Sequence, residues 1–110
     1  MPDDDFKKIL LSAVDESLSS LGDSSKQAIF YHLESSFNLK KENIPSNLTE
    51  FKYALEGIFG TGATYLEKLI AKRLCEKLGL NFDDVENLDF LNCMDAVKKR
   101  TKSSGEYSIP

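Results

Sequence analysis

Apolar residues recur every three or four positions along most of this chain, which is the spacing of one face of an α-helix. The first such segment covers residues 4–21, with apolar positions Phe6, Leu10, Leu11, Val14, Leu18 and Leu21. Three aspartates at the start, Asp3 to Asp5, stand where carboxylates complement the positive end of the helix dipole. The pattern therefore predicts a first helix over residues 4–21, ended by Gly22.

A second helix is predicted over residues 24–37 by a broad apolar stripe. Its members are Ile29, Phe30, Leu33 and Phe37, with Ala28 and Tyr31 widening it. So wide a stripe predicts that this helix is deeply buried. The pattern then breaks over residues 40–47, since Pro45 has no backbone N–H and disfavours helix in the residue before it. We expect the longest connection of the fold there.

Three further helices follow from the same spacing. A short one is predicted over residues 50–59, with Thr49 as its N-cap and the turn Gly60-Thr61-Gly62 after it. The clearest amphipathic pattern covers residues 63–78 and ends at Gly79, which suits the left-handed conformation that follows many helices. The fifth helix is predicted to begin near Asp83 or Asp84, with apolar positions Val85, Leu88, Leu91, Met94 and Val97.

The predicted fold class is all-α, a compact single-domain bundle of about five helices, because no stretch alternates apolar and polar residues as a strand would. We expect residues 1–102 to form the domain and the small, polar residues 103–110 to form a flexible C-terminal tail. With 110 residues, of which 41% are hydrophobic and 29% charged, the chain has the size and composition of one globular domain.

The net charge of -4 disfavours nucleic acid as a partner, because phosphate binding needs a clustered excess of Lys and Arg. A basic cluster does occur at Lys98, Lys99, Arg100 and Lys102, but cations also favour the end of a helix for its dipole. No apolar run approaches the roughly 20 residues that cross a bilayer, and the first residues are acidic where a signal peptide is basic. We expect a cytoplasmic protein without a membrane partner.

The chain has few residues suited to catalysis or metal binding. His32 is the single histidine, and zinc normally needs three or four ligands, so we expect a half-buried structural histidine. Cys75 and Cys93 are isolated within helical patterns, which favours reduced core thiols over a disulfide. We therefore expect no enzyme activity, no cofactor and no metal, with a small-ligand or enzymatic site near His32 as a distant alternative.

The turn around Gly60 deserves comparison with two known motifs. The run from Gly57 to Thr64 has the glycine spacing of a P-loop, but Ala63 stands where the lysine belongs and a helix precedes the loop. Two helices joined by a short turn with glycine also fit a helix-turn-helix outline, which keeps a DNA-binding regulator as the alternative function. The fourth helix would then point Thr64, Glu67, Lys68 or Lys72 toward DNA.

Part of the chain resembles an archaeal family, the Nitrosopumilus output domain. The resemblance lies in residues 21–34, 37–39 and 44–45, and then in Phe51, Ala54, Leu55, the Ile58-Phe59-Gly60-Thr61-Gly62-Ala63 turn and residues 69–80. It implies a small helical module, found alone or attached to other domains, that transmits or receives a regulatory signal in archaea. No established active site comes with it, and residues 1–17 and 81–110 lie outside the matched part.

The sequence thus favours a noncatalytic regulatory or protein-interaction module in archaeal signal transduction. We expect a protein partner, with a second copy of the chain as one candidate. The first and fifth helices are candidate surfaces, because four packed neighbours need not cover all their apolar residues. Half-exposed aromatic residues and the lysines of the fourth helix are the candidate interaction residues: Tyr31, His32, Tyr53, Tyr65, Lys68 and Lys72.

Overall fold

Five α-helices make up most of the backbone that the structure, a computed structural model, describes, which is residues 3–107 for the backbone and 3–101 for the side chains. They are α1 (Asp3–Ser19), α2 (Asp23–Phe37), α3 (Leu48–Phe59), α4 (Ala63–Leu78) and α5 (Phe90–Tyr107). Three short 3-10 helices lie between them: η1 (Lys41–Ser46), η2 (Gly60–Gly62) and η3 (Phe82–Asp84). No strand occurs within residues 3–107, so the all-α prediction is confirmed.

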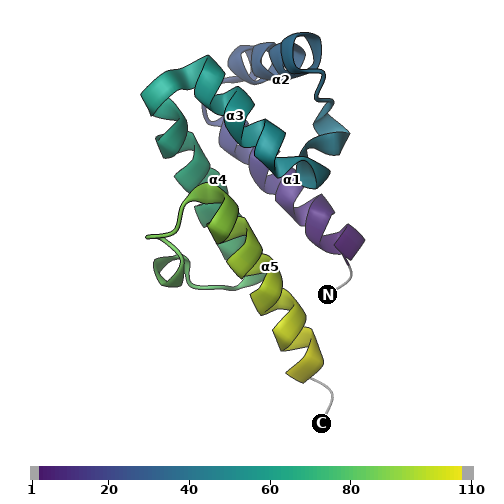
Figure 1. The fold of residues 1–110 in the computed structure, drawn as a ribbon, viewed down its shortest axis with the longest axis vertical. Helices are drawn as coiled ribbons and strands as arrows, with labels where there is room; N and C mark the ends of the chain where they lie inside the picture. Colours follow the sequence, from purple (N-terminus) through teal and green to yellow (C-terminus); the bar gives the residue numbers. More distant parts are fainter. Residues whose placement is uncertain (1–2, 108–110) are drawn as a thin grey trace.

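The centre of the fold is α1, which packs most extensively against α4 and also contacts α2 and η1. Leu10, Val14 and Leu18 of α1 are fully buried, one helical turn apart, as the apolar period requires. In Figure 1, α1, α4 and α5 slant along the same diagonal, α2 lies at the top, and the end of α5 extends past the other helices. The core therefore forms between α1 and α4 and is closed by α2, α3 and α5.

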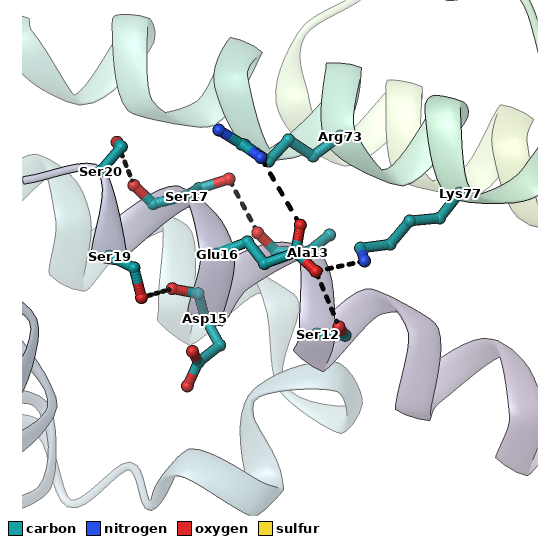
Figure 2. Close-up of polar contacts among 9 residues, drawn as sticks. All are labelled: Ser12, Ala13, Asp15, Glu16, Ser17, Ser19, Ser20, Arg73 and Lys77. Carbon is teal, nitrogen blue, oxygen red and sulfur yellow. Dashed lines mark hydrogen bonds and ion pairs between the residues drawn. The ribbon is translucent and has the colours of Figure 1, made fainter.

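Polar side chains border the contact between α1 and α4, as Figure 2 shows. Glu16 of α1 accepts hydrogen bonds from Lys77 and, at 3.5 Å, from Arg73, both on α4. The buried Ser17 hydroxyl donates to the Ala13 carbonyl at 2.7 Å, so its polar group is satisfied within the helix. On another side of α1, Asp15 accepts from Lys26 and Lys41. Ion pairs thus connect α1 to α2, η1 and α4.

The second helix is much less buried than the sequence predicts. Only Ile29 and Leu33 of α2 are buried, while Ala28, Tyr31 and Phe37 are exposed. The helix contacts α1, α3 and η1, and of its apolar residues Ile29, Leu33 and the partly buried Phe30 pack against the core. The prediction of deep burial is therefore wrong, because the width of a stripe does not fix how much of it the neighbouring elements cover.

The fifth helix begins at Phe90 and not near Asp83 or Asp84. Asp89 caps it, since its side chain accepts a hydrogen bond from the Asn92 N–H at 3.2 Å. The residues before it form η3, where the Asn81 side chain accepts from the Asp83 N–H at 3.0 Å. The connection 79–89 is consequently one residue longer than 38–47, so the prediction of the longest connection at Pro45 is also wrong.

The ends of the other helices agree with the sequence to different degrees. Gly79 takes the expected left-handed conformation (φ 71°), and the Leu80 N–H donates to the Cys75 carbonyl at 2.9 Å. Thr49 lies inside α3, which begins at Leu48 after Asn47 and has no side-chain cap, so the predicted cap is wrong. The α5 backbone is helical to Tyr107, within the segment predicted as a tail, and residues 108–110 lie outside the described residues.

Candidate functional site

The side chains that could act as nucleophiles or bases are poorly placed for chemistry. His32 is exposed on α2, not half-buried as predicted; its Nδ1 lies 3.4 Å from the Ser36 hydroxyl, and its ring packs edge-on to Phe37. Cys75 and Cys93 are buried free thiols, as expected. Burial raises the pKa of both, that of Cys93 to about 11, so neither forms the reactive thiolate readily at neutral pH.

Metal ligands do not gather anywhere in the described part of the chain. Within it, no group of three or more His, Cys, Asp or Glu residues is arranged to hold a metal ion. The P-loop comparison fails on geometry as well as charge, because Gly57 lies inside α3 and a Cβ there would meet the Phe37 ring at 3.3 Å. The functional candidate in this structure is therefore a surface and its hollows.

One such hollow is a pocket of about 390 Å³ between α3, α4, the 79–89 connection and the start of α5. Its volume falls in the range of ligand pockets in proteins. Fourteen residues line it, some with apolar and some with polar or charged side chains. The apolar side comprises Ala71, Phe82, Val85, Leu88, Phe90 and Cys93, and the polar side comprises Lys52, Glu56, Thr64, Glu67, Lys68, Glu86, Asn87 and Asp89. We call this hollow the Glu67 pocket.

Glu67 is the unusual member of this pocket. It is only 7% exposed, and its Oε2 is buried without a hydrogen-bond partner. Burial raises the pKa of Glu67 above its ordinary value, and the nearby carboxylates of Glu56 and Asp89 add to the rise, while Lys52 opposes it. The Lys52 ammonium donates to Glu56 Oε2 at 2.6 Å and acts on Glu67 through its charge, without a hydrogen bond to Glu67 Oε2. A buried carboxylate left without a partner is costly to a fold, so Glu67 is the candidate functional residue of this pocket.

The pocket has an excess of negative charge. Four carboxylates line it, from Glu56, Glu67, Glu86 and Asp89, against the two ammonium groups of Lys52 and Lys68. These acids are far apart in the sequence, since Glu56 lies on α3, Glu67 on α4, and Glu86 and Asp89 in the connection before α5. The structure brings them together because the 79–89 connection folds back onto α3 and α4.

The six residues predicted as an interaction surface do not lie together. Tyr31 and His32 are on α2, Tyr53 is on α3, and the other three are on α4. Lys68 lines the Glu67 pocket. Tyr53 and Tyr65 are well exposed and precede the pocket residues Glu56 and Lys68 by three positions, so they share a helix face with them. The structure therefore separates the α2 candidates from those beside the pocket, and Lys72 is exposed one turn farther along α4.

The structure changes two expectations about surfaces. The apolar residues of α1 and of the described part of α5 pack against the core except Leu11, which lines a separate hollow on α1. Glu67 is buried, so it could not point toward DNA from a recognition helix. The sequence signal for it was present, since Glu67 stands four residues after Ala63 and four before Ala71, on the face of α4 that also carries Leu74.

No family model matches this chain, and neither a curated protein nor a solved structure matches it. Within the described residues, no helix is both long enough and apolar enough to cross a membrane. The resemblance to the Nitrosopumilus output domain therefore stays a prediction. The structural basis for a function is the Glu67 pocket and its unpaired carboxylate oxygen.

Proposed function

We propose that this protein is a noncatalytic interaction module of a regulatory system, and that it binds a partner polypeptide at the Glu67 pocket. The observation that carries the proposal is a buried carboxylate without a partner in a pocket of ligand size. Leu88 lines the same pocket and is 42% exposed, which offers a partner an apolar contact beside the polar one.

The residues that could serve catalysis support a binding role over a chemical one. The thiols are buried and have a raised pKa, and His32 lies on α2, outside the residues that line the Glu67 pocket. The predicted resemblance to a signalling output domain agrees with a module that acts by binding. Its regulatory role would then follow from which partner occupies the pocket.

A different polypeptide suits the pocket better than a second copy of this chain. Three consecutive cationic residues, 98–100, lie on α5. Each makes an ion pair: Lys98 with Asp3 at 2.8 Å, Lys99 with Asp95 at 3.0 Å and Arg100 with Asp84 at 3.0 Å. These described cations are already engaged within the molecule, whereas the side chain of Lys102 lies outside the described residues. A second copy that presented this segment to the acidic pocket would have to break such pairs.

The proposal is tested by selecting peptides that bind the protein from a displayed random library and measuring each affinity with two matched variants. Leu88→Ser removes an exposed apolar side chain at the pocket without changing charge, and Leu21→Ser removes a leucine of similar exposure, 40%, that does not line it. We expect Leu88→Ser to weaken binding by at least about fivefold, since a contacting leucine contributes on the order of 1 kcal/mol, and Leu21→Ser to change nothing. Equal affinities of the two variants would overturn the proposal.

A further inference from the structure

The Oε2 atom of Glu67 has no hydrogen-bond or ion-pair partner in the described part of the chain. Among residues 3–101 no ammonium or guanidinium nitrogen lies within ion-pair distance of it. Lys52 is paired with Glu56 and reaches Glu67 through its charge alone, and Lys68 is exposed. A hydrogen-bond partner for Oε2 would therefore have to be a group that enters the pocket.

A metal ion is not such a group, since no three ligating side chains of the described residues converge on one point. An anion is disfavoured by the four carboxylates around the pocket. A cation on a long aliphatic stem fits better, because the stem can lie along Ala71, Val85 and Leu88 while the charged head reaches the carboxylate.

The aromatic residues of the pocket favour a guanidinium head. Phe82 and Phe90 both line the pocket, and aromatic rings attract cations, arginine more often than lysine. The planar guanidinium is more weakly hydrated than an ammonium group and is better suited to buried pairs with carboxylates. It also carries several donors in one plane, enough to serve Glu67 and a second carboxylate at the edge, such as Asp89.

We propose that the Glu67 pocket receives an arginine side chain of the partner polypeptide, with Glu67 as its counter-ion. This inference rests on the proposed function and adds the chemistry of the contact. The arginine would pair with Glu67 Oε2, the atom that has no partner in the free protein. Specificity would follow, since a neutral side chain in the same place would leave the buried carboxylate unsatisfied.

The minimal probe is capped arginine, N-acetyl-arginine methylamide, compared with its citrulline counterpart, which has nearly the same shape and no charge. Each is titrated into the isotope-labelled protein, and the amide shifts of the pocket residues are followed by NMR. We expect saturable shifts with capped arginine in the millimolar range and affinity at least about tenfold weaker with citrulline. The Glu67→Gln variant should bind both probes equally weakly, since it has lost the charge that distinguishes them.

Glu76→Gln is the matched control, because it removes an exposed carboxylate of the same helix that does not line the pocket. It should keep the preference for arginine over citrulline, which excludes a general effect of negative charge. The inference is overturned if citrulline binds as well as arginine, if neither probe shifts the pocket residues, or if Glu67→Gln retains the preference. The proposed function fails on a different result, selected peptides that are indifferent to Leu88→Ser, so the two failures are distinguishable.

Discussion

Replacing Glu67 with glutamine should make the protein more stable at neutral pH. The substitution keeps the shape of a side chain that is 7% exposed, and it removes a charge whose Oε2 has no partner. A buried polar group left without a partner costs about 1–3 kcal/mol, and a charged group costs more than a neutral one. We therefore expect Glu67→Gln to raise the free energy of unfolding by about 1 kcal/mol at pH 7, and the melting temperature by roughly 4 °C.

The pH dependence of this gain distinguishes a charge effect from a packing effect. Burial raises the pKa of Glu67 above its ordinary value of 4.5, so the folded protein keeps a proton that the unfolded chain has already lost. The wild-type protein therefore loses stability as the pH rises from 4.5 through the folded pKa, whereas the glutamine variant does not titrate there. The difference between the two should be small at pH 4 and should reach a plateau at higher pH.

Urea and thermal unfolding of both proteins between pH 4 and pH 8 measure this difference directly. Glu86→Gln, at an exposed position, serves as the control and should lie within about 0.5 kcal/mol of wild type. A Glu67→Gln protein that is less stable than wild type at pH 7 would show that the Glu67 charge does not destabilise the fold. So would a gain that is the same at every pH, because it would have to come from packing.

Four further outcomes follow from the structure. Lys41 and Lys26 lower the pKa of Asp15, so their ion pairs stabilise the fold above pH 3.8, and this stabilisation is lost as the pH falls through the folded pKa. Asp15→Asn should lower the free energy of unfolding in urea by up to about 1 kcal/mol at pH 7 and by nothing near pH 2. Cys93 should react with a thiol reagent at pH 8 only after denaturation, and fast labelling of the native protein would contradict its burial. Lys68→Glu with Lys72→Glu should leave a DNA-binding anisotropy signal unchanged, while salt-dependent binding that the pair abolishes would restore the helix-turn-helix alternative. Leu10→Ala should cost about 2–5 kcal/mol by calorimetry, since that side chain is fully buried at the centre of the fold, and a loss under 1 kcal/mol would disprove that placement.

The helical fold could be predicted because local signals and packing agree along most of the chain. Residues 63–78 form α4 at the predicted limits, since Gly62 and Gly79 bound an unbroken apolar period. The start of α5 could not be predicted in the same way. Val85 and Leu88 extend the apolar spacing of α5 toward the N-terminus, although these two residues precede the helix and are not in an α-helix. A helical spacing of two apolar residues does not distinguish a helix from a connection that packs one of them against the core.

The site was less predictable than the fold, because it forms from segments far apart in the sequence. Lys52, Glu67 and Asp89 come from α3, α4 and the connection before α5, and nothing in the spacing of those residues indicates that they line one pocket. The position of Glu67 on the buried face of α4 was the available signal. It was obscured because Leu66 and Lys68, on either side, fit the ordinary division of an amphipathic helix.

Whether a partner polypeptide binds at the Glu67 pocket can be decided by locating a bound peptide on the protein. The measurement is the map of amide chemical-shift changes when a peptide from the displayed library saturates the labelled protein. If the peptide binds at the pocket, the largest changes should cluster at Thr64, Ala71, Val85 and Leu88. These residues line the pocket from α4 and from the 79–89 connection. A cluster on α2 around Tyr31, which is 74% exposed, with the pocket residues unmoved, would contradict it.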